Sequence, residues 1–331
     1  MTQFEEQATK DLFDKNLITE NQYQEITAYR ALGIFSLNAE LKLLLYFSAL
    51  LFTSGIGILI YDNIDSFGHI VLLSTLLIVI SGCFYYCFKN SKGFQKTETI
   101  SESPFLEYIV LIANVLTCIF IGYLQFQYEA FGTHYGLATL IPTIVSFSCA
   151  YYFDNKSVLT IAITGLAAYI GLSVTPQDIF NSSNDFYDNQ TLTYSAIALG
   201  VLLIVWTIYS SRINLKTHFT LVYLTFALHM ISVAIISNLF TDDLMWLLFT
   251  VVLGISSFYF YKVSHKQKAI SLYIFMIVYA YIGFNLFLFR ILDFIRPDDI
   301  WILLILLLPI YFIVSIVMFI KLIKKFNKEI A

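Results

Sequence analysis

Positive charge in this sequence is confined to alternate connections between long apolar runs, and few topologies can satisfy that pattern. Ten such runs can be marked, at 41–61, 67–88, 104–127, 135–153, 157–174, 191–209, 217–239, 243–262, 269–290 and 299–321. Each is about 20 residues long, which is the length that crosses a hydrocarbon core of roughly 30 Å as an α-helix. The sequence therefore predicts an all-α, polytopic membrane protein with about ten transmembrane helices.

The lysines and arginines test this assignment of spans. Of the 19, only Arg290 and Arg296 fall on one side of a ten-span chain. The others fall on the opposite side: Lys10, Lys15, Arg30, Lys42, Lys89, Lys92, Lys96, Lys156, Arg212, Lys216, Lys262, Lys266, Lys268, Lys321, Lys324, Lys325 and Lys328. A missed span would invert every later loop and destroy the pattern. Because cytoplasmic loops collect positive charge, both termini are predicted to be cytoplasmic.

Composition excludes several other classes of protein. Apolar residues make up 58% of the chain and charged residues 13%, whereas soluble domains have about a quarter charged residues. No basic stripe suggests a nucleic-acid partner, and the first forty residues have no early apolar core typical of a signal peptide. All cysteines lie inside apolar runs, where they are expected to act as small hydrophobes. The expected partner is the lipid bilayer, and neither a metal nor another cofactor is expected.

The first forty residues predict a small cytoplasmic helical hairpin. Segments 3–15 and 20–31 read as short helices, and Thr19 followed by Gln22 is typical of a capping box that opens the second. Forty residues bury too little apolar surface for a robust independent fold. The hairpin is either an inert leader or a contact for a protein partner or a second copy. The predicted domains are the hairpin at 1–40, the transmembrane domain at 41–322 and a basic cytoplasmic tail at 323–331.

The N-terminal part of the chain resembles a known family. The stretch from Leu12 to Ile26 contains Ile18-Thr-Glu20, and the first span carries Gly55-Ile-Gly57 before an outer Tyr61-Asp-Asn-Ile-Asp65. These features, over about the first 70 residues, resemble the predicted bacterial membrane proteins called domain of unknown function 2157. Asn16 stands where that family usually shows Gly. The resemblance implies a multi-pass protein of the bacterial cytoplasmic (inner) membrane, and it implies no activity.

The third span carries polar residues along one helix face. Glu107, Asn114, Gln125 and Glu129, together with Cys118 and Gly122, stay within about 80° of arc and extend about 33 Å along the axis. Glu107 complements the helix dipole at the start of the span, whereas Glu129 is disfavoured at its end. Asn114 and Gln125 need partners within the bundle, because an unpaired amide in lipid is costly. The stripe predicts either a solute path or adhesion between helices.

Weaker polar patterns occur in two later spans. His218, Thr225 and His229 share one face of the seventh span, and an ionisable group at the depth of His229 is a functional candidate. Asn285 is polar at depth in the ninth span, where Arg290 and Asp293 are expected to pair near the outer end. Asn114 and His229 lie about 15 Å and 18 Å from the starts of their spans. We therefore expect the third and seventh spans to face one another or a common cavity.

These patterns leave two function classes open. The first is a transporter of a small solute or a lipid, with a polar path along the third and seventh spans. The second is a non-transporting membrane scaffold or sensor, with the N-terminal hairpin as its partner-binding element. No catalytic motif is present in the sequence, so we do not expect an enzyme. Transport predicts water around Asn114 and His229, whereas a scaffold predicts that direct hydrogen bonds between helices seal these side chains.

Overall fold

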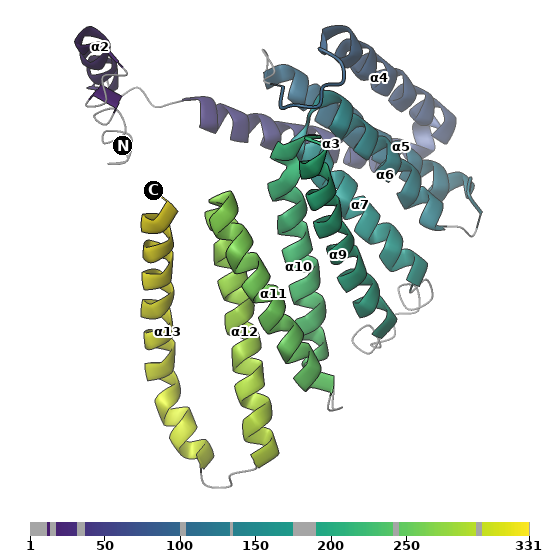
Figure 1. Cartoon of the computed structure of the whole chain (residues 1–331). Helices are drawn as coiled ribbons and strands as arrows, with labels where there is room; N and C mark the ends of the chain where they lie inside the picture. The colour runs from purple at the N-terminus through teal and green to yellow at the C-terminus, as the bar shows by residue number, and fades with distance from the viewer. Residues whose placement is uncertain are drawn as a thin grey trace. The chain divides into compact units, whose positions relative to one another are not determined.

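The computed structural model describes residues 12–13, 18–31, 37–99, 104–132, 135–174, 190–240, 245–295 and 300–330. Within these ranges the regular elements are helices (Figure 1). Their bounds are α2 Glu20–Ala31, α3 Leu37–Phe67, α4 His69–Asn90, α5 Pro104–Tyr128, α6 Tyr135–Phe153, α7 Lys156–Val174, α9 Gln190–Arg212, the 3₁₀ helix η2 Thr217–Phe219, α10 Thr220–Asn238, α11 Met245–Gln267, α12 Ile270–Ile295 and α13 Ile300–Ile330. The protein is a polytopic α-helical membrane protein.

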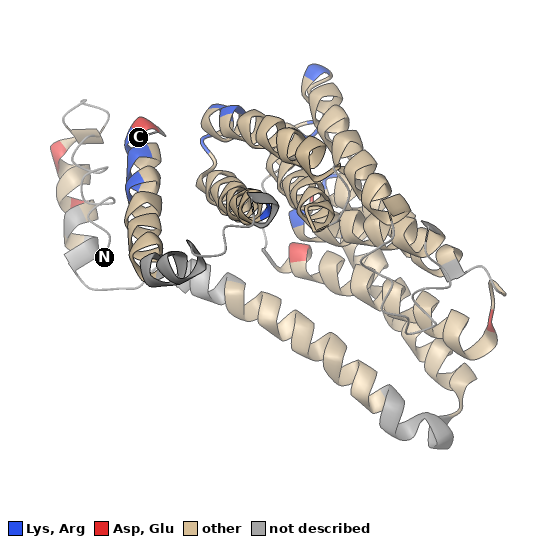
Figure 2. Ribbon diagram, turned by 90° about the horizontal axis from the view of Figure 1, so that it is seen from below, with Lys and Arg blue, Asp and Glu red and all other residues tan. Residues whose placement is uncertain are grey.

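Among the residues that the structure describes, eight helices are long and apolar enough to cross a bilayer: α4, α5, α6, α7, α9, α10, α11 and α12. They coincide with the second to ninth predicted spans. The predicted first span lies in α3, where residues Leu43–Leu59 form a shorter apolar stretch. The predicted tenth span lies in α13, and its side chains before residue 309 are outside the described residues. Figure 2 shows that the bodies of the described helices are almost free of charge, with Lys, Arg, Asp and Glu gathered near their ends.

The chain divides into two compact units, residues 1–61 and 62–331, and the boundary falls inside α3. In the first unit the predicted capping box is present. The Thr19 backbone N–H donates to Gln22 Oε1 at 2.9 Å, and the Gln22 backbone N–H donates to Thr19 Oγ1 at 3.4 Å. The Phe13 and Tyr23 rings stack with centroids 4.7 Å apart. The first predicted helix otherwise lies outside the described residues, and the proposed domain division stays a prediction.

The second unit is built from consecutive antiparallel helix pairs. α4 packs on α5, α6 on α7, α9 on α10, and α11 on α12. A glycine allows close approach in three of these pairs, because a Cβ at Gly165, Gly200 or Gly283 would collide with Thr143, Ile231 or Leu253 on the neighbouring helix. Small residues have this role in membrane bundles, where tight van der Waals packing holds helices together.

Helix α10 occupies the centre of the second unit. It packs on α7, α9, α11 and α12, and 56% of its apolar stretch is buried, against 22% for α9 and α11. Large apolar side chains on the outer helices are exposed instead, such as Ile78 on α4 and Val251 on α11. Lipid tails solvate such side chains, so these helix faces contact the bilayer.

Candidate functional site

Three connections between helices meet at one end of the second unit. They are residues 91–99 between α4 and α5, residues 154–155 between α6 and α7, and residues 213–216 ahead of η2. The Lys216 backbone N–H donates to the Lys96 carbonyl oxygen at 2.7 Å, and Thr99 donates to Asp154. The charge pattern assigns all three connections to the same aqueous side, so these contacts agree with the alternation of the predicted spans.

Asp154 lies at the centre of this meeting point. It follows the last residue of α6 with a left-handed φ of 59°, a conformation that Asp and Asn tolerate better than most residues. Asn155 then caps α7, because its Oδ1 accepts the backbone N–H groups of Ser157 and Val158 at 2.9 and 3.0 Å. The Asn155 amide also donates to the Glu107 carbonyl oxygen at 2.8 Å. This two-residue turn fixes the direction of the Asp154 carboxylate.

The Asp154 side chain is buried and surrounded by donors. It is 2% exposed, and its Oδ2 accepts the backbone N–H and the hydroxyl of Thr99 at 2.6 and 2.8 Å. Its Oδ1 lies 2.5 Å from His218 Nε2 and 3.1 Å from Lys216 Nζ. A buried carboxylate is tolerated only when it is paired and hydrogen-bonded in this way. The cluster of Thr99, Asp154, Lys216 and His218 is called the loop cluster below.

Lys216 and His218 are held against Asp154 by an irregular turn. The backbone of Lys216 is in the left-handed conformation, with φ 49°. The 3₁₀ helix η2 follows it, so His218 lies ahead of the regular α-helix α10. The Lys216 side chain is 1% exposed and the His218 side chain 9%. Lys216 Nζ is near enough to Asp154 for an ion pair, but it makes no hydrogen bond of good geometry to any described residue, and His218 Nδ1 has no described partner either.

The electrostatics of the loop cluster centre on the buried ion pair of Asp154 and Lys216. Burial raises the pKa of the Asp154 carboxyl, but the hydrogen bonds from Thr99 and the charge of Lys216 outweigh burial and hold that pKa below its usual range. The ionised carboxylate only accepts, so His218 donates through Nε2. The cluster therefore joins three loops through one buried charge pair.

A separate hydrogen-bonded group of two tyrosines and a tryptophan lies beside η2. The Tyr151 and Tyr223 hydroxyls lie 2.9 Å apart, and Trp206 Nε1 donates to the Tyr151 hydroxyl at 2.8 Å. These side chains join α6, α9 and α10. The ring of Tyr151 also meets Phe219 of η2 edge-on, with centroids 5.5 Å apart. The loop cluster is thus supported by hydrogen bonds between three spans.

The loop cluster contains an Asp–His pair without a described nucleophile. An Asp–His pair activates a nucleophile when a hydroxyl or thiol lies on the second ring nitrogen, and no described side chain bonds His218 Nδ1. Within the described ranges, no group of three or more His, Cys, Asp and Glu side chains is arranged to hold a metal ion. What the loop cluster does chemically is to fasten connections that are far apart in the sequence.

The polar residues predicted along the third span make separate local contacts. Glu107 is half-buried in the first turn of α5. Gln125 is 5% exposed but bonds the loop that follows its own helix, accepting from the Phe131 backbone N–H and donating to the Gly132 carbonyl oxygen, both at 2.9 Å. Glu129 is exposed and left-handed, with φ 45°, directly after α5 ends. Gln125 therefore connects the C-terminal end of α5 to the loop that follows it, and Glu129 is the first residue after that helix.

Asn114 is the one third-span residue without such an explanation. It is 0% exposed, and neither its Nδ2 nor its Oδ1 has a hydrogen-bond partner among the described residues. Leaving a buried amide unpaired costs about 1–3 kcal/mol for each polar group. Asn114 therefore marks a place where a water molecule or a ligand group would be stabilised.

The seventh-span residues also point to different partners. His218 belongs to the loop cluster and Thr225 donates to the Leu221 carbonyl oxygen of its own helix at 2.8 Å. His229 Nδ1 lies 2.7 Å from the Tyr279 hydroxyl of α12, and its ring meets Phe275 edge-on at 4.7 Å. These three residues therefore bond different partners, and their common role along a polar path stays a prediction.

Asn285 and Arg290 connect the C-terminal helices. The Tyr311 hydroxyl of α13 donates to Asn285 Oδ1 at 2.8 Å, and the Asn285 amide donates to the Tyr281 carbonyl oxygen at 2.7 Å. Arg290 Nε donates to the Leu239 carbonyl oxygen at the end of α10, 3.1 Å away, where a cation complements the helix dipole. The side chain of Asp293, its expected partner, is outside the described residues.

The structure does not bring Asn114 and His229 together. α5 packs on α4, α6 and α7, whereas α10 packs on α7, α9, α11 and α12. His229 is directed to α12, which is not among the helices that pack closely on α5. The expected shared environment of the two residues is therefore not found, and each belongs to a different group of helices.

Comparison with known proteins gives a family but no activity. Residues 10–159, slightly less than half of the chain, match the model of a family described as predicted membrane protein, domain of unknown function 2157 (DUF2157). This match confirms the resemblance found in the first 70 residues and extends it through α6 into the start of α7. The chain matches none of the curated proteins and none of the solved structures with which it was compared.

Proposed function

We propose that the protein is a non-transporting membrane scaffold or sensor. The observation that carries this proposal is the pairing of polar side chains at membrane depth. His229 meets Tyr279 of α12 and Asn285 meets Tyr311 of α13. Near the end of α5, Gln125 bonds the loop that follows its own helix. These three groups each have a specific protein partner, whereas Asn114 has none among the described residues. Direct hydrogen bonds between helices at His229 and Asn285 support a frame held together by its polar side chains. In this proposal the helix bundle is a rigid scaffold, and the protein acts by binding a partner or a ligand.

Transport is the second candidate, and Asn114 is the observation that favours it. Its buried, unpaired amide is the kind of group that a permeating solute or a resident water would contact. The transport hypothesis then needs a cavity that opens to water around α5. The scaffold hypothesis instead needs Asn114 to stay closed from both aqueous sides.

Accessibility of position 114 separates the two hypotheses. In a background with Cys83, Cys87, Cys118 and Cys149 replaced by Ala, Asn114→Cys is treated in sealed vesicles of both orientations with a membrane-impermeant maleimide. We expect no modification from either side, whereas the matched Lys92→Cys variant in an exposed loop reacts from one side only. Modification of Asn114→Cys at a rate near that of Lys92→Cys would favour transport.

The N-terminal hairpin supplies the partner-binding element in this proposal. Its support is that α2 has its own cap and a stacked aromatic contact with Phe13, so the segment is ordered without a span. Deletion of residues 1–35 is expected to leave membrane insertion intact, because the apolar helices carry the targeting. Loss of insertion, measured by alkaline extraction of membranes, would show that the hairpin is part of the membrane domain itself.

The orientation belongs to the same proposal. With both termini in the cytoplasm, reporters fused after Lys92, Lys216 and Lys268 should read cytoplasmic, and those after Asp65, Asp185 and Asp299 should read external. The contacts among the 91–99, 154–155 and 213–216 connections support a common side for the first two of these sites. Two or more contrary readings would overturn the ten-span topology and the bacterial cytoplasmic membrane orientation with it.

A further inference from the structure

Helix α13 is attached to its neighbours at two separated places. At the first, Tyr311 donates to Asn285 of α12, and its ring stacks at 6.3 Å on Tyr281. At the second, Phe326 is 1% exposed and stacks on Tyr273 with centroids 4.1 Å apart and an interplanar angle of 13°. An ion-pair contact of 3.2 Å between His265 of α11 and Glu329 reinforces this second attachment.

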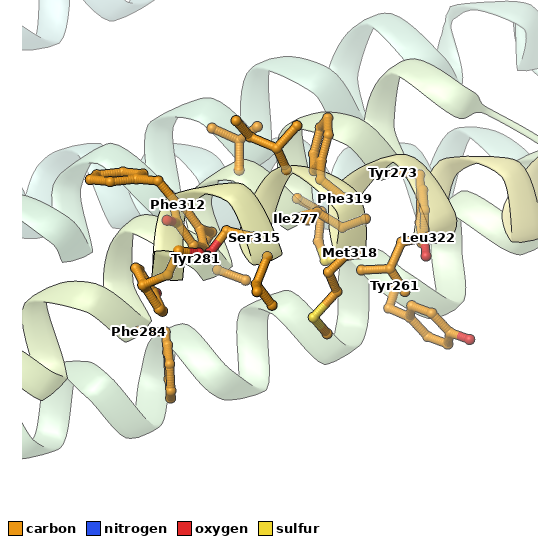
Figure 3. A pocket seen from close by; sticks show the side chains of 16 residues that line it. Tyr261, Tyr273, Ile277, Tyr281, Phe284, Phe312, Ser315, Met318, Phe319 and Leu322 are labelled. Atoms are coloured by element: carbon orange, nitrogen blue, oxygen red, sulfur yellow. Dashed lines mark hydrogen bonds between the residues drawn. The ribbon is translucent and has the colours of Figure 1, made fainter. Parts of the chain in front are cut away.

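A groove of about 670 Å³ lies between these two attachments. Its walls come from α11, α12 and α13, and Figure 3 shows Tyr281, Ser315 and Phe312 toward one end and Tyr261 and Tyr273 toward the other. The volume falls within the roughly 300–1,000 Å³ of typical ligand sites. The space is therefore large enough for a bound molecule.

The chemistry of the walls favours a hydrocarbon ligand. Between the attachments, α13 presents Ser315, Met318, Phe319 and Leu322 to the groove. The Ser315 hydroxyl donates to the Tyr311 carbonyl oxygen at 2.8 Å, so it is already bonded. Water needs two to four polar partners to occupy a cavity, whereas an apolar chain needs none. Lipid tails are the hydrocarbon that surrounds these helices.

The length of the groove matches one leaflet of a bilayer. The lining residues of α13 run from Tyr311 to Leu322, eleven residues apart, which corresponds to about 16 Å along its axis. One leaflet of the hydrocarbon core is about 15 Å thick. A groove of this length accommodates one extended acyl chain that enters from the end near Tyr261.

The same end of the groove carries positive charge. Exposed lysines lie at this end of both walls, with Lys262 and Lys266 on α11 and Lys321, Lys324 and Lys325 on α13. Lys325 also lies 3.7 Å from the Glu329 carboxylate. Lysines at the surface of a membrane attract anionic headgroups. Their position places a phosphate at the mouth of the groove when the acyl chain lies inside it.

We propose that this groove is a binding site for one anionic glycerophospholipid, taken from the leaflet whose surface the lysines face. One acyl chain fills the space between α12 and α13, and the headgroup phosphate pairs with the lysines of α11 and α13. The site is separate from the loop cluster. It stands whether the protein is a scaffold or a transporter, and in a sensor it is the ligand site.

Photocrosslinking tests this site. The full chain is reconstituted in phosphatidylcholine vesicles with a small fraction of phosphatidylglycerol whose acyl chain carries a diazirine, and the crosslinked peptides are mapped. The groove-filling variant is Ala280→Trp, and the matched control is Ala168→Trp, an exposed alanine on α7. A charge variant combines Lys321→Gln with Lys325→Gln, and its control combines Lys89→Gln with Lys92→Gln.

We expect crosslinks concentrated on α12 and α13, with unlabelled phosphatidylglycerol competing better than phosphatidylcholine. Ala280→Trp should lower crosslinking about fifteenfold, the loss expected when two chain methylenes leave the groove, and Ala168→Trp should not. The lysine variant should remove the preference for the anionic lipid. Equal labelling of α9 and α13, equal competition by both lipids, or crosslinks between two copies across α13 would each overturn the proposal, and the competition on the unmodified chain needs no variant to fold.

Discussion

The loop cluster and the polar pairs inside the spans use different chemistry. In the loop cluster, a buried carboxylate collects donors from three connections and is neutralised by one lysine. At membrane depth, His229 and Asn285 each bond one tyrosine on a neighbouring helix, and no formal charge is required. The first arrangement joins distant segments at one point, whereas the second joins helices two at a time.

The difference follows from what each environment can tolerate. A charge at the centre of a bilayer raises the free energy of the folded protein. Neutral side chains that each form one hydrogen bond hold the spans together without that penalty. At the end of the bundle, backbone N–H groups and ionised side chains from loops can surround a carboxylate. The strongest polar fastening is therefore expected where the loops meet, and the following predictions test that ranking.

The largest effect is expected for Asp154→Ala, which leaves Lys216 buried without its counter-charge. Removing one partner of a buried ion pair costs about 3–5 kcal/mol, and the free energy of unfolding in detergent should fall by that amount. Glu98→Ala is the control, because its pair with Lys156 is about half exposed on both sides and should contribute less than about 1 kcal/mol. Similar losses in the two variants would remove the special role of Asp154.

Acid should weaken the same interaction. The Asp154 carboxyl has a lower pKa in the folded protein than its ordinary value of 3.8. Its stabilising contribution is therefore complete above that ordinary pKa and is lost as pH falls through the lower, folded-state pKa. Unfolding measured from pH 6 downward should show this loss below about pH 4. The Asp154→Asn variant should show a smaller acid-dependent loss, and an unchanged acid profile would contradict the assignment.

A smaller effect is expected for Tyr279→Phe, which removes only the hydroxyl that pairs with His229. Hydrogen bonds between membrane helices contribute about 0.6 kcal/mol on average and up to about 1.7, so the stability should fall within that range. Tyr194→Phe on the exposed face of α9 is the matched control and should change little. A loss as large as that of Asp154→Ala would reverse the ranking of the two regions.

The smallest effect on the membrane domain is expected for Thr19→Ala. Loss of the cap should destabilise α2 by about 1 kcal/mol, which hydrogen exchange of the first turn of α2 should detect. The unfolding of the second unit should not change, because Thr19 and Gln22 bond only within the hairpin. A shift in both units would show that the hairpin is coupled to the bundle.

Periodic features of this chain were predictable from the sequence. Apolar run length and charge alternation predicted the spans, because the bilayer imposes one length and one charge bias on every helix. The capping box of α2 was predictable because Thr19 and Gln22 are only three residues apart. His229 and Asn285 were chosen for their depth, and both have partners on other helices, although the sequence could not identify Tyr279 or Tyr311.

The loop cluster was missed because nothing local defines it. Thr99, Asp154 and Lys216 come from three connections, and only the packing of α6, α7 and α10 brings them together. One signal was available, since Asp154 is an acid in a two-residue turn on the lysine-rich side of the membrane. Helical periodicity also could not identify the partner of His218, which lies in η2 ahead of the regular helix.

A double-mutant cycle on Asp154 and Lys216 tests the central claim most directly. Asp154→Asn and Lys216→Met each leave one buried charge unpaired, whereas the double variant leaves neither. We predict that the double variant loses less stability than the sum of the single losses, with a coupling energy of about 3 kcal/mol, at the upper end for residues in contact. Losses that add within about 0.5 kcal/mol would mean that the buried charge pair does not fasten the three loops.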